Sequence, residues 1–204
     1  DHQSTPPSAA EILNAPLLRI LDKARWAPSG DNEQQWRFRV LGPLAFDVEY
    51  ASDPCNVYEY DNGRPVHLAV GMLLETARIA AAEEGMRLHW QVGASPAANK
   101  HIVHVQVAPD AGVLADDLYP HIESRSVCRS PLPRTPLRAQ EKQQLADALG
   151  DSLKIFWYES PAQRRQIARL NAQGAGVRQR IQEAFKVHLK VLDWRQRFSP
   201  DKVP

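Results

Sequence analysis

The stretch from Arg64 to Glu84 constrains the fold most, because its apolar residues lie on most sides of the helix that their spacing predicts. A helix of this kind must be covered on most of its surface, so we expect it at the centre of the domain. Gly85 follows directly and predicts the end of the helix, since glycine is favoured just after a C-terminus. The apolar positions are Val66, Val70, Leu73, Leu74, Ala77, Ile79, Ala80 and Ala81.

Two pairs of segments alternate polar and apolar residues and predict antiparallel hairpins. The first pair is Trp36–Leu41 and Phe46–Ala51, separated by Gly42-Pro43. The second pair is Met86–Val92 and His101–Val107, joined by a longer loop. Strands that pair antiparallel, mixed with helices, indicate an α+β fold in which helices flank an antiparallel or mixed sheet around the long central helix.

Further helices are predicted on both sides of these strands. A capping box at Ser8 and Glu11 begins a helix that kinks or restarts at Pro16 and ends near Trp26. The remaining predicted elements are a surface loop over 52–63, helices over 113–122 and 135–149, a strand over 153–158, a helix from Ser160 that breaks at Gly174-Ala175-Gly176, and a last amphipathic helix from Val177 to Leu192.

Composition restricts the classes of function. The 204 residues suffice for one domain with a real core, and the formal net charge of +1 gives no general attraction for nucleic acid. Cys55 and Cys128 lie far apart in the sequence, and no apolar run has membrane-spanning length, so we expect a cytoplasmic protein without nucleic-acid or membrane partners. The chain begins at Asp1 without a methionine, and we expect a processed or trimmed start.

A short polar turn, Pro28-Ser29-Gly30-Asp31-Asn32, joins the first predicted helix to the first predicted strand. Proline fixes φ, glycine tolerates a positive φ, and asparagine bonds its own backbone, so each favours a turn for a different reason. The backbone amides and the Ser29 and Asn32 side chains suit the polar edge of a ligand. A plain connection without a ligand is the alternative.

A second candidate site is the basic segment that contains Arg125, Ser126 and Arg129. Two guanidinium groups with hydroxyls and backbone amides nearby are suited to a phosphate or another delocalised anion. Two exposed arginines on a loop are the alternative.

Other chemistries lack the required spacing. His101 and His104 lie three apart in a predicted strand and face opposite sides, while His67, His89 and His188 stand alone on their elements, so we expect no metal site. Ser29 lies on a helix-to-strand turn, the reverse of a hydrolase nucleophile elbow. Gly174-Ala175-Gly176 lacks the third glycine of a dinucleotide-binding motif.

The stretch Ala24-Arg25-Trp26-Ala27-Pro28-Ser29-Gly30-Asp31-Asn32-Glu33-Gln34-Gln35-Trp36-Arg37-Phe38 resembles the A-R-x-A-P-S-x-x-N-x-Q-P-W-x-F motif of the FMN-dependent nitroreductase family, with Gln35 in place of proline. Arg125-Ser126-Val127-Cys128-Arg129 is similar to the R-x-S-x-R/K motif of that family, with Val127 where the family has serine or threonine. The resemblance covers most of the chain, to about Pro200, and implies a nitroreductase-like fold.

In the family the arginine motif comes first, whereas here it follows the turn motif, as in the fused double-length branch in which two half-repeats imitate a dimer. The resemblance therefore implies a first half-repeat over 1–110 and the start of a second over 111–204. It also implies one composite flavin site per chain, with a further homodimer as an open possibility. Family members continue beyond the point that corresponds to Pro204, so we expect a truncated form or a pocket open on that side.

The resemblance also implies roles for these residues. Arg125 would hold the ribityl phosphate of FMN with Ser126 beside it, and Arg129 would lie near the flavin pyrimidine edge. Pro28, Ser29, Gly30 and Asn32 would contact the isoalloxazine from the other half. The implied activity is hydride transfer from NAD(P)H through FMN to a nitroaromatic, quinone or similar acceptor. The alternatives are a flavin-sequestering protein with little turnover and a structural relative without the cofactor.

Overall fold

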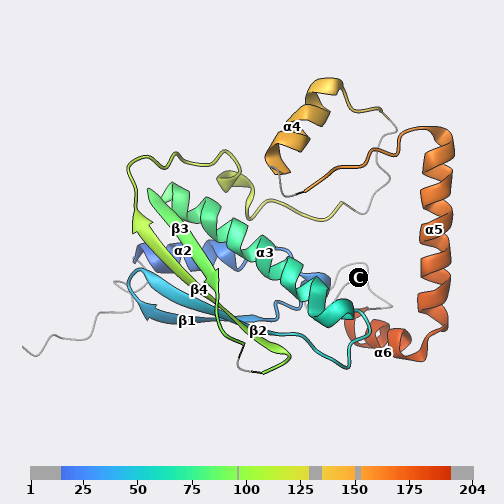
Figure 1. Cartoon of the computed structure of the whole chain (residues 1–204), viewed down its shortest axis with the longest axis horizontal. Coiled ribbons are helices and arrows are strands. Elements are labelled where there is room, and N and C mark those ends of the chain that lie inside the picture. Colours follow the sequence, from blue (N-terminus) through green and yellow to red (C-terminus); the bar gives the residue numbers. More distant parts are fainter. Residues whose placement is uncertain (1–14, 96, 129–134, 150–152, 194–204) are drawn as a thin grey trace, which may run out of the picture. The chain divides into compact units, whose positions relative to one another are not determined.

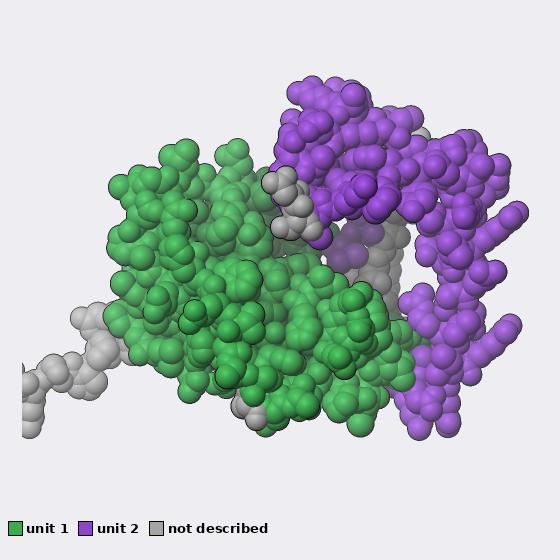
Figure 2. Space-filling view, in the orientation of Figure 1, with its two compact units in different colours: residues 1–126, 187–204 green, residues 127–186 purple. Residues whose placement is uncertain are grey.

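The computed structural model describes residues 15–95, 97–128, 135–149 and 153–193. The chain divides into two compact units (Figure 2). Unit 1 consists of Asp1–Ser126 and Val187–Pro204, and unit 2 of Val127–Lys186. The division into half-repeats over 1–110 and 111–204, which the family resemblance implies, stays a prediction.

Unit 1 contains a four-stranded antiparallel sheet in the order β1-β2-β4-β3 (Figure 1). The strands are β1 (Trp36–Gly42), β2 (Ala45–Ala51), β3 (Met86–Val92) and β4 (Lys100–Pro109). Both predicted hairpins are confirmed, because β1 pairs with β2 and β3 with β4. The pairing of β2 with β4 joins the two hairpins into one sheet.

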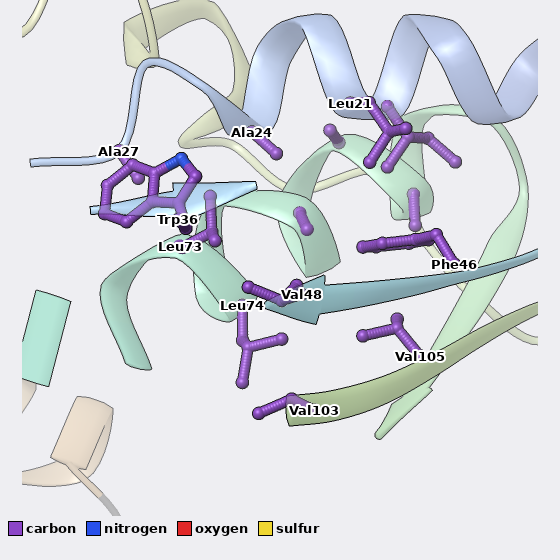
Figure 3. Close-up of a cluster of buried hydrophobic side chains, with 14 of the residues drawn as sticks. Leu21, Ala24, Ala27, Trp36, Phe46, Val48, Leu73, Leu74, Val103 and Val105 are labelled. Atoms are coloured by element: carbon purple, nitrogen blue, oxygen red, sulfur yellow. The ribbon is translucent and has the colours of Figure 1, made fainter. Parts of the chain in front are cut away.

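Two helices of unit 1 pack on one face of this sheet and share its hydrophobic core (Figure 3). They are α2 (Pro16–Ala24), which begins at the proline where a kink or restart was predicted, and the 24-residue α3 (Tyr60–Glu83). Leu17 and Ile20 of α2 and Leu73 of α3 are buried against Phe46 and Val105 of the sheet. Each strand turns every second residue toward the helices, as the sequence pattern predicts for a sheet with one covered face.

The first turn of α3 is not an ordinary α-helical turn. Asp61, Asn62 and Gly63 have φ values of 53°, 58° and 86°, in the left-handed region. A Cβ at Gly63 would lie 2.5 Å from Ser52 Cβ, so this position needs glycine for both space and φ. The Glu59 carboxylate then accepts a hydrogen bond from the Val66 amide at 3.3 Å and caps the right-handed part of the helix.

The opposite face of the sheet is polar. One row of residues crosses all four strands, with Arg39 opposite Asp47, Asp47 opposite His104, and His104 opposite Gln91. The Asp47 carboxylate lies 2.6 Å from Arg39 Nη2 and 2.7 Å from His104 Nδ1, and the residue is only 1% exposed. Two partners on neighbouring strands therefore compensate one buried charge.

Unit 2 is described by α4 (Ala139–Leu149), α5 (Pro161–Arg180) and the first part of α6 (Gln182–Val191), which continues into unit 1. The predicted strand over 153–158 is wrong, since these residues have no strand partner within the described part of the chain. The predicted break at Gly174 is also wrong. α5 runs through both glycines and ends at Arg180, because the next residue, Ile181, has an extended ψ of 121°.

The predicted helix over 113–122 shortens to one 3₁₀ turn, Tyr119–His121. Asp116 explains the late start, because its carboxylate accepts the Leu118 amide at 3.0 Å and favours a turn over a helix. None of the helices in the described ranges combines the length and the apolar character needed to cross a membrane.

Candidate functional site

The turn after α2 is held by hydrogen bonds of its own. Ser29 Oγ accepts the Gln34 amide at 3.1 Å, and the Gln34 side-chain amide donates to Arg25 O at 3.0 Å and to Asn32 Oδ1 at 3.4 Å. The Asn32 amide bonds Ser29 O at 3.2 Å. Gln34 therefore fixes the turn from both its backbone and its side chain.

The positive φ values of the turn fall on residues other than the one predicted. Asp31, Asn32 and Gln34 have φ of 49°, 57° and 47°, whereas Gly30 does not have a positive φ. Aspartate and asparagine adopt the left-handed region more readily than other side chains, because their short polar groups bond the local backbone. Three residues with positive φ within four positions are uncommon, and they concentrate backbone strain in the candidate ligand-binding turn.

Ion pairs fasten the segment before Arg125 to both helices of unit 1. Lys23 of α2 pairs with Glu123, and Arg78 of α3 contacts Asp116 at 2.7 Å. The chain then makes a helical turn, in which the Arg125 amide donates to His121 O at 2.9 Å. The Arg125 guanidinium is thereby brought to 3.4 Å from Trp26 O, the carbonyl just before the polar turn.

Arg125 and Pro28 line the same cavity, which has a volume of about 340 Å³. Its walls are largely apolar, and the polar groups at its edge come from α3 and from the segment that carries Arg125. The lining residues include Trp26, Met72, Thr76, Ile79, His121 and Ile122. A guanidinium has five N–H donors, and within the described part of the chain only one contact, to Trp26 O, engages them.

The other predicted site residues do not share this cavity. Ser29 and Gly30 line a small cavity of about 70 Å³, and Asn32 lines a larger cavity of about 1080 Å³. Ser126 is exposed and lines none of these cavities. Arg129 lies outside the described residues.

A carboxyl group that the sequence did not single out lies beside the turn. Glu59 lines the small cavity with Ser29 and Gly30. Burial raises the pKa of the Glu59 carboxyl, and the nearby Glu33 charge raises it further. A carboxyl of raised pKa next to a candidate ligand site can hold a proton near that ligand.

The sequence also missed a cluster of rings that three elements bring together. Tyr50 Oη and His67 Nδ1 are 3.1 Å apart, and the His67 and His101 rings meet edge to face with centroids separated by 4.7 Å. His67 therefore does not stand alone, although His101 and His104 do face opposite sides of the sheet as predicted. No sequence pattern signals this cluster, since it depends on the β2–β4 register and on how α3 is turned.

Within the described ranges, no group of three or more histidine, cysteine, aspartate or glutamate side chains has the geometry of a metal site. No protein-family model matches the chain, and a search of curated proteins finds no match. The geometry of unit 1 therefore carries the functional argument by itself. The candidate site consists of the Arg125 guanidinium, the strained polar turn after α2, and the apolar cavity that Arg125 and Pro28 line.

Proposed function

We propose that this chain binds FMN and acts as an oxidoreductase of the nitroreductase type, with NAD(P)H as donor and a nitroaromatic, quinone or similar acceptor. The observation that carries the proposal is the position of Arg125 beside the polar turn. Arg125 and Trp26 are 99 residues apart in the chain, yet the Arg125 guanidinium lies 3.4 Å from Trp26 O. Arg125 also lines one cavity with Pro28 of the turn. A composite flavin site requires this proximity.

The residues present fit a flavin mononucleotide in their chemistry. Arg125 offers a cation for the phosphate, with charge-assisted hydrogen bonds as the source of affinity. Trp26, Pro28 and Ile79 offer apolar surface for a flat ring system. Ser29 Oγ accepts from Gln34 and can still donate its own proton, and the Asn32 amide nitrogen can donate as well.

FMN, when bound, would supply the redox chemistry by accepting a hydride from NAD(P)H and passing electrons to the acceptor. The chain then needs to bind, orient and exclude water, and no covalent nucleophile is required of it. Glu59, whose pKa burial raises, can hold a proton close to Ser29 and Gly30. Positive charge from Arg125 would favour an anionic ligand in the neighbouring cavity.

The proposal includes the finer features that the family resemblance implies. These are a nitroreductase-like fold around α3, a pseudo-dimer made of two half-repeats, contacts from Ser126 and Arg129, and a cytoplasmic location. A further homodimer fits the proposal too. The four-stranded antiparallel sheet covered by α2 and α3 is compatible with this fold.

Titration of the purified chain with FMN, followed by flavin fluorescence and absorption, tests the binding step. We expect fluorescence quenching and a protein-bound oxidised-flavin spectrum. Anaerobic addition of NADH or NADPH should then bleach the flavin, and a nitroaromatic or quinone should restore its colour. Binding without bleaching would favour a flavin-sequestering protein, and no quenching at all would overturn both flavin functions.

Replacing Arg125 with alanine should weaken FMN binding by about 1.5–3 kcal/mol, the scale of a hydrogen bond to a charged group. Arg138→Ala is the matched control, since Arg138 is an exposed arginine of unit 2 that bonds Glu141. An FMN dissociation constant that Arg125→Ala leaves unchanged would show that Arg125 does not hold the phosphate.

A further inference from the structure

A second cavity of unit 1 lies away from the polar turn, between α3 and the β3 side of the sheet, and has a volume of about 530 Å³. We call it the edge cavity, because β3 is an edge strand. One face of α3 lines it with residues at helical spacing, and the strands supply the other wall. The lining residues are His67, Val70, Gly71, Leu74, Glu75 and Arg78 of α3 and Tyr50, Leu88, Trp90, Val92, His101 and Val103 of the sheet.

The walls of the edge cavity suit an apolar ring compound. Trp90 and Val92 are large apolar residues of β3 that are 55% and 69% exposed, so a ligand would cover apolar surface that now faces solvent. The volume falls in the range of ordinary small-molecule sites. Gly71 leaves open space on the α3 side, since a Cβ built there meets nothing within 4 Å.

Polar groups lie at the two ends of the α3 face, and one end is already neutralised. Arg78 contacts Glu75 at 2.8 Å and Asp116 at 2.7 Å, so its charge is compensated within the protein. His67 lies eleven residues earlier, roughly 16 Å along the helix axis. A polar group of a ligand is therefore expected to bind at the other end of the cavity, near Tyr50, His67 and His101.

The hydrogen bond between Tyr50 and His67 sets which atom of His67 can donate. Burial raises the pKa of the Tyr50 phenol and so favours the protonated hydroxyl, which can donate to His67 Nδ1, 3.1 Å away, when the imidazole carries its own proton on Nε2. An imidazole that accepts at Nδ1 carries its proton on Nε2. Among the described residues no partner occupies that Nε2–H, which makes it a donor at the cavity wall.

His101 adds no charge of its own to this end of the cavity. Burial lowers the pKa of His101, and the neighbouring His67 lowers it further. Its Nε2 atom is closed off from solvent and has no hydrogen-bond partner among the described residues, which disfavours an imidazolium there. With the charge of Arg78 compensated and His101 neutral, neither group gives an advantage to an anionic ligand.

We propose that the edge cavity binds a small neutral ring compound with a carbonyl oxygen, which accepts a hydrogen bond from His67 Nε2. The edge cavity shares Glu75 with the cavity that Arg125 lines, and Tyr50 and His101 with the larger cavity that Asn32 lines, but it contains none of the residues proposed to contact FMN. Ligand binding in the edge cavity can therefore be tested independently of FMN binding.

Equilibrium dialysis with three matched probes tests the proposal. The probes are 2-acetylnaphthalene, which has the carbonyl, 2-ethylnaphthalene, which lacks it, and 2-naphthoate, which is an anion. We expect the ketone to bind about 2- to 10-fold more tightly than the hydrocarbon, the gain of one net hydrogen bond. The anion should bind more weakly than the ketone. Equal binding of ketone and hydrocarbon would overturn the proposal.

Variants locate the binding. His67→Phe keeps an aromatic ring but removes the donor, so the advantage of the ketone should disappear while the hydrocarbon still binds. His89→Phe is the matched control, because His89 is an exposed residue of the same sheet and lies outside the edge cavity. It should leave the preference unchanged. A ketone preference that survives His67→Phe would exclude His67 as the donor.

Filling the cavity gives a test that does not depend on the hydrogen bond. Gly71→Leu adds a side chain where a Cβ meets no neighbour, and leucine favours the helix over glycine, so the variant should fold and bind none of the probes. Gly174→Leu in α5 meets open space as well and is the control. Sedimentation velocity distinguishes a second occupant. A dimer that Gly71→Leu abolishes, without any probe binding to the parent chain, would assign the cavity to a second copy and overturn the proposal.

Discussion

Units 1 and 2 differ in where their apolar side chains lie. In the described part of the chain, every buried hydrophobic residue except Ala184 belongs to unit 1. α4 and α5 of unit 2 have no buried residues, and unit 2 exposes Leu170, Val177 and Phe156 among other large apolar side chains. The sheet and helices of unit 1 therefore stabilise one another, whereas the helices of unit 2 depend on local interactions.

The largest expected difference between the units comes from matched leucine truncations. Leu73 is 1% exposed in the core of unit 1, and Leu73→Ala should lower the free energy of unfolding by about 3–5 kcal/mol through lost burial and a cavity. Leu170 of α5 is 55% exposed, and Leu170→Ala should change it by no more than about 0.5 kcal/mol. Urea unfolding measures both. Equal losses would show that α5 contributes to a core.

Removing one charge of an ion pair should give a smaller difference between the two units in the free energy of unfolding. Asp47→Asn leaves Arg39 and His104 without their buried partner, and the two are themselves half-exposed, so we expect a loss of about 2 kcal/mol. The counterpart in unit 2 is Glu159→Gln, which breaks a pair with Lys142 whose two ends are both solvent-accessible. That variant should lose at most about 1 kcal/mol. If urea unfolding gives the reverse order, burial does not set the strength of these pairs.

The helix caps should act locally in unit 2. Ser160 Oγ accepts the Gln163 amide at 3.2 Å and Gln163 Oε1 accepts the Ser160 amide at 3.1 Å, which completes a capping box on α5. Ser160→Ala should lower the stability of α5 by about 1 kcal/mol. Hydrogen exchange should show faster exchange of α5 amides and unchanged α3 amides. Faster exchange of the α3 amides as well would mean that the units unfold together.

The smallest effect concerns pH. Hydrogen bonding to Arg19, with Nε at 2.8 Å from Oε1, lowers the pKa of the Glu84 carboxyl below its ordinary value of 4.5. A lowered folded pKa stabilises the protein above pH 4.5 and loses that contribution as the pH falls through the folded value. Glu84→Gln should remove this part of the acid dependence of unit 1, at most about 0.5 kcal/mol.

Glu141 of unit 2 is the matched control for the pH dependence. Hydrogen bonding to Arg138 also lowers the pKa of Glu141, and both side chains of this pair are solvent-accessible. Glu141→Gln should leave the acid unfolding curve of unit 1 unchanged. A flatter acid limb in this variant would show that the two units are coupled.

Local patterns predicted the parts of the fold that local forces determine. The hairpins β1–β2 and β3–β4 follow from the alternation of polar and apolar residues in neighbouring segments, and the end of α3 follows from Gly85, whose φ is 66°. The run 153–158 is mostly apolar and aromatic, as strands often are, but a strand also needs a partner that no local pattern supplies. Gly174 did not break α5, because one glycine costs only about 1 kcal/mol in a helix of this length.

The candidate site was predictable to a similar degree. The turn and Arg125 were identified as motifs, and the ion pairs Lys23–Glu123 and Arg78–Asp116 that bring them together could not be, since they join residues far apart in the chain. The Tyr50–His67 contact depends on the β2–β4 pairing and on the packing of α3. The sequence therefore predicted which residues could form the site, whereas their proximity in space depends on tertiary packing.

The row Arg39–Asp47–His104–Gln91 has a consequence for how the sheet assembles. Side chains of a strand alternate between faces, so a slip of β2 by one residue would exchange Asp47 with Phe46 and move its carboxylate among the valines of the core. Such a misaligned sheet would bury an unpaired charge and expose a large aromatic ring. The buried Asp47 carboxylate thus favours the observed alignment of β1, β2 and β4 over the alignments shifted by one residue.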